Sequence, residues 1–246
     1  MLAGGAAAGC VERRVTRVET NVESSTTWAL SPATADELDA EAFESYVAEM
    51  ETEYGDSGVW GGSDAPSDGF VTAHVQRLPV LRESSGQPGG GEPTLRPDDV
   101  DRNATAFPVV DAAVVLYDVE GEDRYWLWAA VDVRDETFAG DAPATVLSAG
   151  VSIRNGRVTD TGDVSADDGT AAVDLAGETV RRFPLDVEST DVGTGDRAGE
   201  AGYYVVEWEG ATDGVQSVNG VLDATRDGEY DLAWSVGAGY RRVQRR

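Results

Sequence analysis

Between Thr16 and Leu30 two sets of residues alternate, and the set at even positions contains five β-branched residues, at 16, 18, 20, 22 and 26. A period of two with β-branched side chains on one face predicts a strand. The valines at positions 11, 15, 18 and 22 also fit a helical spacing. The pattern therefore favours a strand over 16–30 but leaves a helix open at its beginning.

The next apolar stripe predicts the main helix of the chain. Its members recur three or four residues apart and are Phe43, Tyr46, Val47, Met50 and Tyr54. Such spacing places them on one face of an amphipathic helix. The segment Thr34-Ala-Asp-Glu37 has the form of a capping box, and Gly55 follows the stripe, so we expect the helix to begin near 34–37 and to end at Gly55.

Most of the remaining chain has the pattern of strands. Residues 108–119 and 124–133 flank Gly121-Glu122-Asp123, which is typical of a hairpin turn, and the apolar run 109–117 predicts a central strand. The other predicted strands are 71–75, 145–153, 157–160, 179–187, 203–209, 215–224 and 230–236. Together the elements predict an α+β fold: predominantly antiparallel sheet, in meanders and hairpins, with one main amphipathic helix near the N-terminus.

One long segment interrupts this pattern. Residues 82–103 are rich in Pro, Gly and charged side chains, and we expect a mobile loop at about 82–105. Asn103-Ala-Thr105 at its edge is a glycosylation acceptor pattern, and a position in an exposed loop makes Asn103 a candidate for modification.

The charge of the chain is strongly acidic. Its 246 residues include 46 Asp and Glu against 19 basic residues, a net charge of −27, and every basic residue is arginine. In molar salt the Debye length falls to about 3 Å, so this self-repulsion is screened and the carboxylates act as a hydrated coat. The composition resembles that of proteins from extremely halophilic archaea. Disorder and an acidic surface for a basic partner are the alternatives, while nucleic-acid binding is disfavoured.

Residue types exclude several chemistries. Without lysine there is no P-loop lysine and no Schiff base. A single histidine excludes multi-histidine zinc sites, and no Gly-x-Ser-x-Gly elbow accompanies it. His74, on the polar side of its predicted strand, is interpreted as an exposed structural residue. We expect no catalytic residue, no metal ligand and no cofactor.

Two acidic segments leave alternatives open. Residues 160–169 and 98–101 gather carboxylates that could hold Ca²⁺, although neither has EF-hand spacing. A pair of catalytic carboxylates, as in glycosidases, could also be formed in space by residues distant in the sequence. A carboxylate- or metal-dependent hydrolase is therefore retained as the least favoured function.

The chain has one cysteine, and its position predicts a location. Cys10 follows Ala7-Ala-Gly9, and the four residues resemble the lipobox of prokaryotic lipoproteins, in which the cysteine is lipidated and becomes the mature N-terminus. The apolar stretch Leu2–Gly9 is shorter than a working signal requires. We therefore expect residues 1–9 to be a truncated signal and residues 10–246 to form a single extracytoplasmic β-rich domain. The resemblance to haloarchaeal surface lipoproteins implies twin-arginine export.

The two ends of the sequence are basic, unlike the rest. Residues 1–17 and 241–246 together carry seven Arg and one Glu, net +6, which leaves −33 for residues 18–240. Both ends at a membrane, or two solvated tails, account equally well for this distribution. A lipid at Cys10 would hold the domain on the outer face of the cytoplasmic membrane.

The function predicted from the sequence is that of a non-catalytic binding or envelope-structural module, with an envelope glycan or protein as partner. The alternative is a solute- or carbohydrate-binding lipoprotein with Trp126, Trp128 and Trp208 as a stacking platform. The same aromatic residues are explained more simply as core.

Overall fold

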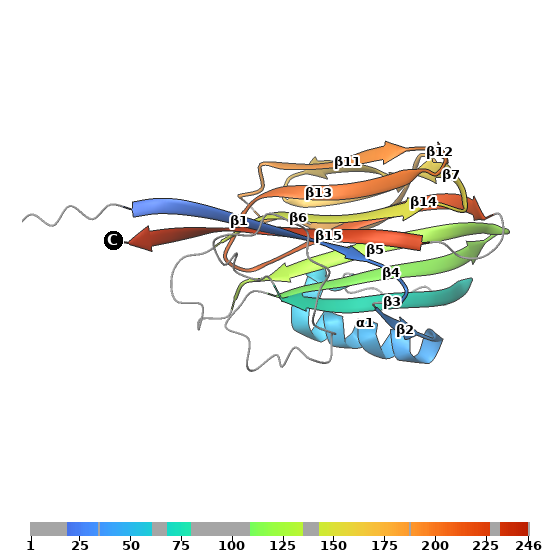
Figure 1. The fold of residues 1–246 in the computed structure, drawn as a ribbon, viewed down its shortest axis with the longest axis horizontal. Helices are drawn as coiled ribbons and strands as arrows, with labels where there is room; N and C mark the ends of the chain where they lie inside the picture. The colour runs from blue at the N-terminus through green and yellow to red at the C-terminus, as the bar shows by residue number, and fades with distance from the viewer. Residues whose placement is uncertain are drawn as a thin grey trace, which may run out of the picture.

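The fold is that of a computed structural model. It describes residues 19–33, 35–60, 68–79, 109–134, 143–186, 188–226 and 232–245. In these residues the chain forms three sheets, all with antiparallel pairing, together with helix α1 (Ala40–Tyr54) and the short 3-10 helix η1 (Gly55–Ser57). The predicted α+β class, mainly antiparallel sheet with one main helix near the N-terminus, is confirmed (Figure 1).

Five strands form the first sheet, in the order β1-β15-β6-β13-β11. They are β1 (Glu19–Leu30), β6 (Ala144–Ile153), β11 (Asp191–Arg197), β13 (Tyr203–Thr212) and β15 (Leu232–Arg245). Of the strand predicted over 16–30, residues 19–30 are present as β1, which pairs with β15 from the other end of the sequence, and residues 16–18 lie outside the described residues.

Seven strands form the second sheet, in the order β12-β7-β14-β5-β4-β3-β2. They are β2 (Asp36–Leu38), β3 (Phe70–Pro79), β4 (Val109–Val119), β5 (Glu122–Asp132), β7 (Gly156–Thr161), β12 (Gly199–Glu200) and β14 (Val215–Arg226). β4 lies between β3 and β5, and all its residues from Val109 to Tyr117 are buried. The central strand predicted over 109–117 is confirmed.

The two large sheets pack face to face. His74 of β3 stacks on Trp234 of β15, with ring centroids 5.6 Å apart. Tyr204 of β13 lies over Gly220 of β14, where an added Cβ would stand 2.4 Å from the tyrosine Cε1. Gly220 thus permits the close approach of the sheets, and apolar side chains from both fill the space between them.

The opposite face of the seven-stranded sheet is also covered. α1 packs there through Phe43, Val47, Met50 and Tyr54, and the ring of Tyr54 lies 5.9 Å from that of Trp128. Figure 1 shows α1 running along β3. The third sheet has the order β10-β9-β8 and comprises β8 (Asp163–Asp167), β9 (Thr170–Leu175) and β10 (Glu178–Pro184). Arg181 of β10 donates a hydrogen bond to the carbonyl oxygen of Trp60, which follows η1 in the chain.

The beginning of α1 differs from the prediction. The N-cap is Asp39, whose Oδ1 accepts a hydrogen bond of 2.9 Å from the backbone N–H of Ala42. Residues 36–38 form β2 and pair with β3 instead of opening the helix, so the capping box predicted at 34–37 is wrong. Gly55 lies at the C-cap with φ of 57°, as the sequence predicts.

The β4–β5 hairpin turns at Glu120 and Gly121, one position earlier than the predicted Gly121-Glu122-Asp123. Val119 pairs with Glu122, so the loop has two residues, and both have positive φ, 55° and 90°. Positive φ at both positions is the requirement of a type I′ turn, which glycine meets without strain. The side chain of Asp118 accepts the N–H of Gly121 at 2.9 Å.

Two strands extend past the rest of the sandwich at one end. β15 pairs with β6 as far as Tyr240, and beyond that residue its one described strand partner is β1. The register joins Glu23 to Arg241 and Glu19 to Arg245. We call residues 19–23 and 241–245 the terminal ribbon, which projects from the body in Figure 1.

Candidate functional site

The three tryptophans proposed as a stacking platform lie in the interior. Trp126, Trp128 and Trp208 are 6%, 1% and 0% exposed. Trp126 and Trp128 share one face of β5 and pack beneath η1 and α1, whereas Trp208 belongs to β13 in the other sheet. The three rings are not brought together, and none presents a face to solvent. The three tryptophans are core residues, which was the simpler of the two explanations of these residues.

Their indole nitrogens are used inside the fold. Trp126 Nε1 donates to Asn219 Oδ1 at 3.3 Å, and Trp128 Nε1 donates to the carbonyl oxygen of Ser57 at 3.2 Å. Trp208 Nε1 donates to Ser189 Oγ at 2.7 Å. These bonds satisfy buried polar groups, so the tryptophans position η1 and the segment before β11.

His74 is buried, which corrects its prediction as an exposed residue. The side chain faces the other large sheet, against Trp234, and the residue is 4% exposed. Burial lowers the pKa of the imidazole, because the charged form loses its hydration there. The period-two pattern identified its face of β3 correctly, but that face is covered.

A buried cluster of charged and phenolic groups lies between α1 and the seven-stranded sheet. Asp111 of β4 is 2% exposed and accepts a short hydrogen bond from the Tyr54 hydroxyl. Arg77 of β3, 8% exposed, places its Nη2 2.9 Å from Glu53 Oε1 and 3.5 Å from Asp111 Oδ2. One guanidinium therefore serves two carboxylates, and the cluster joins α1, β3 and β4.

This cluster was not predicted from the sequence. In the sequence, two of its members are charged residues within apolar runs. Asp111 lies in "PVVDAAVVLY" and Arg77 in "HVQRLPV". A charge in such a run is rarely buried without a partner. Asp111 and Arg77 could therefore have been predicted to pair with each other inside the fold, although the two runs do not identify Tyr54 or Glu53 as further partners.

Burial raises the pKa of Asp111 to about 7, and it outweighs the lowering effects of Arg77 and of the Tyr54 hydrogen bond. Burial, followed by the nearby Asp111 charge, also raises the pKa of Tyr46 on α1. The carboxyl of Asp111 therefore exchanges a proton near neutral pH inside the fold.

This titration predicts a pH dependence of stability. The folded pKa of Asp111 lies above its unfolded value of 3.8, so the folded state binds the proton more tightly between pH 4 and 7. Asp111 therefore contributes fully to the free energy of unfolding below pH 4. This contribution decreases as the pH rises to about 7, by up to about 1.4 kcal/mol for each pH unit. Asp111→Asn should remove this slope in denaturant unfolding followed from pH 4 to 8, whereas Asp167→Asn, at an exposed position, should retain it. A wild-type slope that survives in Asp111→Asn would contradict the assignment.

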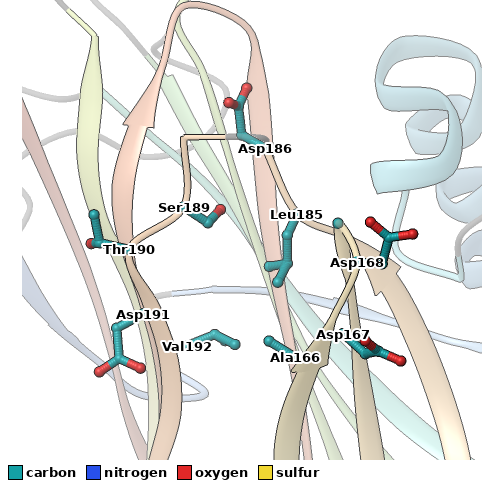
Figure 2. A pocket seen from close by; sticks show the side chains of 10 residues that line it. Ala166, Asp167, Asp168, Leu185, Asp186, Ser189, Thr190, Asp191 and Val192 are labelled. Carbon is teal, nitrogen blue, oxygen red and sulfur yellow. The ribbon is translucent and has the colours of Figure 1, made fainter.

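A groove of about 530 Å³ opens between the β8–β9 turn and the segment that leads into β11. Leu185, Ala166 and Val192 provide its apolar surface, and Figure 2 shows Leu185 between the two walls. The other lining residues are Asp167, Asp168, Gly169, Asp186, Ser189, Thr190 and Asp191.

The carboxylates of this groove do not converge. Figure 2 shows Asp168 and Asp191 on opposite walls, directed apart. Asp186 accepts hydrogen bonds from Thr212 Oγ1 at 2.8 Å and from the backbone N–H of Glu188 at 3.0 Å. Across the described ranges, no group of three or more His, Cys, Asp or Glu side chains is placed to hold a metal ion. The acidic segment 160–169 thus forms no such group there.

Several predicted features lie outside the described residues. They are Cys10, Asn103, the loop at about 82–105, and the acidic segment 98–101. For the part of the chain that is described, no helix combines the length and apolar character needed to cross a membrane.

The terminal ribbon pairs residues 19–23, which follow the basic N-terminal part of the sequence, with residues 241–245, which belong to the basic C-terminal part. Arg241, Arg242 and Arg245 are paired in register with Glu23, Val22 and Glu19. Glu19 is nine residues after Cys10, a distance of at most about 30 Å in a fully extended chain. The backbone N–H of Arg241 donates to the carbonyl oxygen of Pro143 at 3.0 Å, which ties the base of the ribbon to the body.

Comparison with protein-family models, curated proteins and solved structures finds no match.

Proposed function

We propose that the protein is a lipid-anchored extracytoplasmic module of an extreme halophile, held on the outer face of the cytoplasmic membrane through Cys10. Its role is binding or structural support in the cell envelope, without catalysis. An envelope glycan or an envelope protein is the partner class.

One observation carries the location. β1 begins nine residues after Cys10 and runs antiparallel to β15, so the chain leading from Cys10 enters the fold beside residues 241–245. A lipid at Cys10 would therefore bring the arginines of both sequence ends to the same membrane surface. This arrangement favours the placement of both ends at a membrane over two unrelated solvated tails.

Two further observations support a non-catalytic role. His74, the one histidine, is a core residue stacked on Trp234, and the cluster around Asp111 is enclosed between α1 and the sheet. Both hold structural elements together by contacts inside the fold. The acidic composition suits a medium of high salt. There the repulsion between carboxylates is screened, and the carboxylates keep the protein hydrated and soluble.

Cell fractionation tests the anchor. In the full-length gene, Cys10→Ser removes the lipid attachment site and should move the protein from the membrane fraction to the medium or the soluble fraction. Ala6→Ser is the matched control, since it adds a hydroxyl to the same stretch and keeps the cysteine. Continued membrane association of Cys10→Ser at the wild-type level would refute the anchor.

A further inference from the structure

β11 is the outermost strand of the five-stranded sheet. One of its edges pairs with β13, and no described strand pairs with the other. β11 follows the upper border of the molecule in Figure 1. The N–H and C=O groups along such an edge can form hydrogen bonds with a strand of another molecule. The side chains of β11 then decide which strand fits.

Two carboxylates beside this edge lack a cation. The register of β11 and β13 places Asp191 directly opposite Glu209, and both residues are exposed. Like charges directly opposite each other on neighbouring strands are destabilising. No described side chain forms an ion pair with either carboxylate. An arginine that reached Asp191 from outside the chain would relieve this repulsion.

A second copy of β11 provides such an arginine. Asp191 and Arg197 lie at the two ends of the strand, and Thr194 lies midway between them. When two copies pair antiparallel about Thr194, each Thr194 stands opposite its own counterpart, and Asp191 stands opposite Arg197 of the second copy. The two-fold symmetry forms this ion pair twice. Gly193 then meets Gly195 of the second copy, so no like charges stand opposite each other across the new pair.

Other registers lose this complementarity. A shift by one residue joins the outer face of one sheet to the inner face of the other, and in one direction it sets Asp191 against Asp196 of the second copy. The symmetric registers centred on Gly193 or Gly195 leave Asp191 opposite a glycine. Pairing about Thr194 therefore forms two ion pairs and also keeps the two outer faces continuous.

The middle of the strand has room for this approach. A Cβ added at Gly193 would meet no heavy atom within 4 Å, and one added at Gly195 would meet only Val205 Cγ1, at 3.3 Å. Thr194 is exposed. Thr–Thr is one of the favourable pairs across neighbouring strands.

Arg197 is already held at the outer face of the sheet. Its guanidinium lies 5.8 Å from the centroid of the Tyr203 ring and donates to the carbonyl oxygen of Ala201. A guanidinium has five N–H donors, so this bond leaves others for a carboxylate. A side chain that is positioned before binding loses less conformational freedom when the ion pair forms.

We propose that β11 is a dimerisation edge, at which two copies of this chain pair antiparallel about Thr194 and join their five-stranded sheets. Seven paired residues span about 23 Å, which is short for an interface, so the dimer is weak and reversible. This contact goes beyond the proposed function and does not depend on a lipid at Cys10.

Charge reversal tests the pairing. The full chain is followed by sedimentation equilibrium up to about 1 mM protein, in salt that maintains the fold and with a reducing agent that prevents disulfide formation at Cys10. We expect a monomer–dimer equilibrium for the wild type. Asp191→Arg sets two cations against each other, and Arg197→Asp sets two carboxylates against each other. Each change occurs twice in the dimer and should weaken dimerisation by at least about tenfold.

The two variants should rescue each other. In an equal mixture, a chain with Asp191→Arg presents two cations to the two carboxylates of a chain with Arg197→Asp. Mixed dimers should therefore form with an affinity within about threefold of the wild type. The double variant Asp191→Arg/Arg197→Asp should dimerise with itself to the same extent, because it exchanges the charges of both pairs.

Glu44→Arg on α1 and Arg182→Asp on β10 are the matched controls. Both positions are exposed, and the two substitutions make the same changes in net charge as the edge variants. Each should change dimerisation by less than about twofold. Circular dichroism identifies the folded variants. A wild type that stays monomeric over the whole concentration range, equal weakening in edge and control variants, or a mixture of the two edge variants without mixed dimers would overturn the proposal.

Discussion

Replacing Trp128 with alanine is expected to lower the free energy of unfolding by about 3–5 kcal/mol. The side chain is 1% exposed, packs 5.9 Å from the ring of Tyr54 and donates to the carbonyl oxygen of Ser57. Its loss leaves a cavity beneath α1 and an unsatisfied carbonyl group at η1. Denaturant unfolding followed by circular dichroism, in salt that maintains the fold, measures the change.

Tyr203→Ala is the matched control for Trp128→Ala, because Tyr203 is an aromatic residue of the neighbouring sheet that is 42% exposed. Its replacement should cost less than about 1 kcal/mol, since less buried area is removed. If Trp128→Ala were as mild as Tyr203→Ala, the tryptophan would not belong to the core, and the stacking platform would again need consideration.

Arg77→Ala is the second substitution with a large expected effect, about 3–5 kcal/mol of unfolding free energy above pH 7. It removes the guanidinium that lies 2.9 Å from Glu53 and 3.5 Å from Asp111, and so leaves two carboxylates without their shared cation. Below pH 7 the loss should become smaller, because protonation neutralises Asp111, whose pKa burial already raises to about 7. Unfolding measured at pH 5 and pH 8 gives both values.

Arg182→Ala, at an exposed position of β10, controls for the loss of one positive charge from an acidic protein. It should change the unfolding free energy by no more than about 0.5 kcal/mol. An Arg77→Ala loss of the same small size at pH 8 would mean that Asp111 and Glu53 are solvated instead of held by Arg77.

The sequence predicts the local parts of this fold well. The apolar run 109–117 indicates a strand buried on both faces, and β4 is such a strand. Gly121 marks the hairpin because a two-residue turn with positive φ favours glycine. In the helix stripe from Phe43 to Tyr54, all members are buried as the spacing predicts except Tyr46, which is partly buried.

The errors arise where distant segments compete with local preference. Thr34-Ala-Asp-Glu37 has the form of a cap, but residues 36–38 gain backbone hydrogen bonds by pairing with β3, and Asp39 caps the helix instead. His74 alternates with apolar neighbours on β3, which suggests a wet face. Alternation within one strand contains no information about a second sheet that covers that face.

The candidate sites were even less accessible to sequence reasoning. Tyr54 and Asp111, which share a hydrogen bond, are 57 positions apart, and the paired ends of β1 and β15 lie more than 200 apart. The sequence showed two basic ends but not that β1, which follows the first of them, pairs with β15, which contains residues 241–245. Aromatic residues on one strand likewise fit a platform or a core until the covering layers are known.

The central claim is that Cys10 carries the lipid that holds this acid-coated sandwich outside the cell. Mass spectrometry of the protein isolated from its native membranes tests it most directly. The account predicts a mature chain that begins at Cys10 and bears the added mass of a lipid on the sulfur. A free thiol at Cys10, with residues 1–9 still attached, would contradict it.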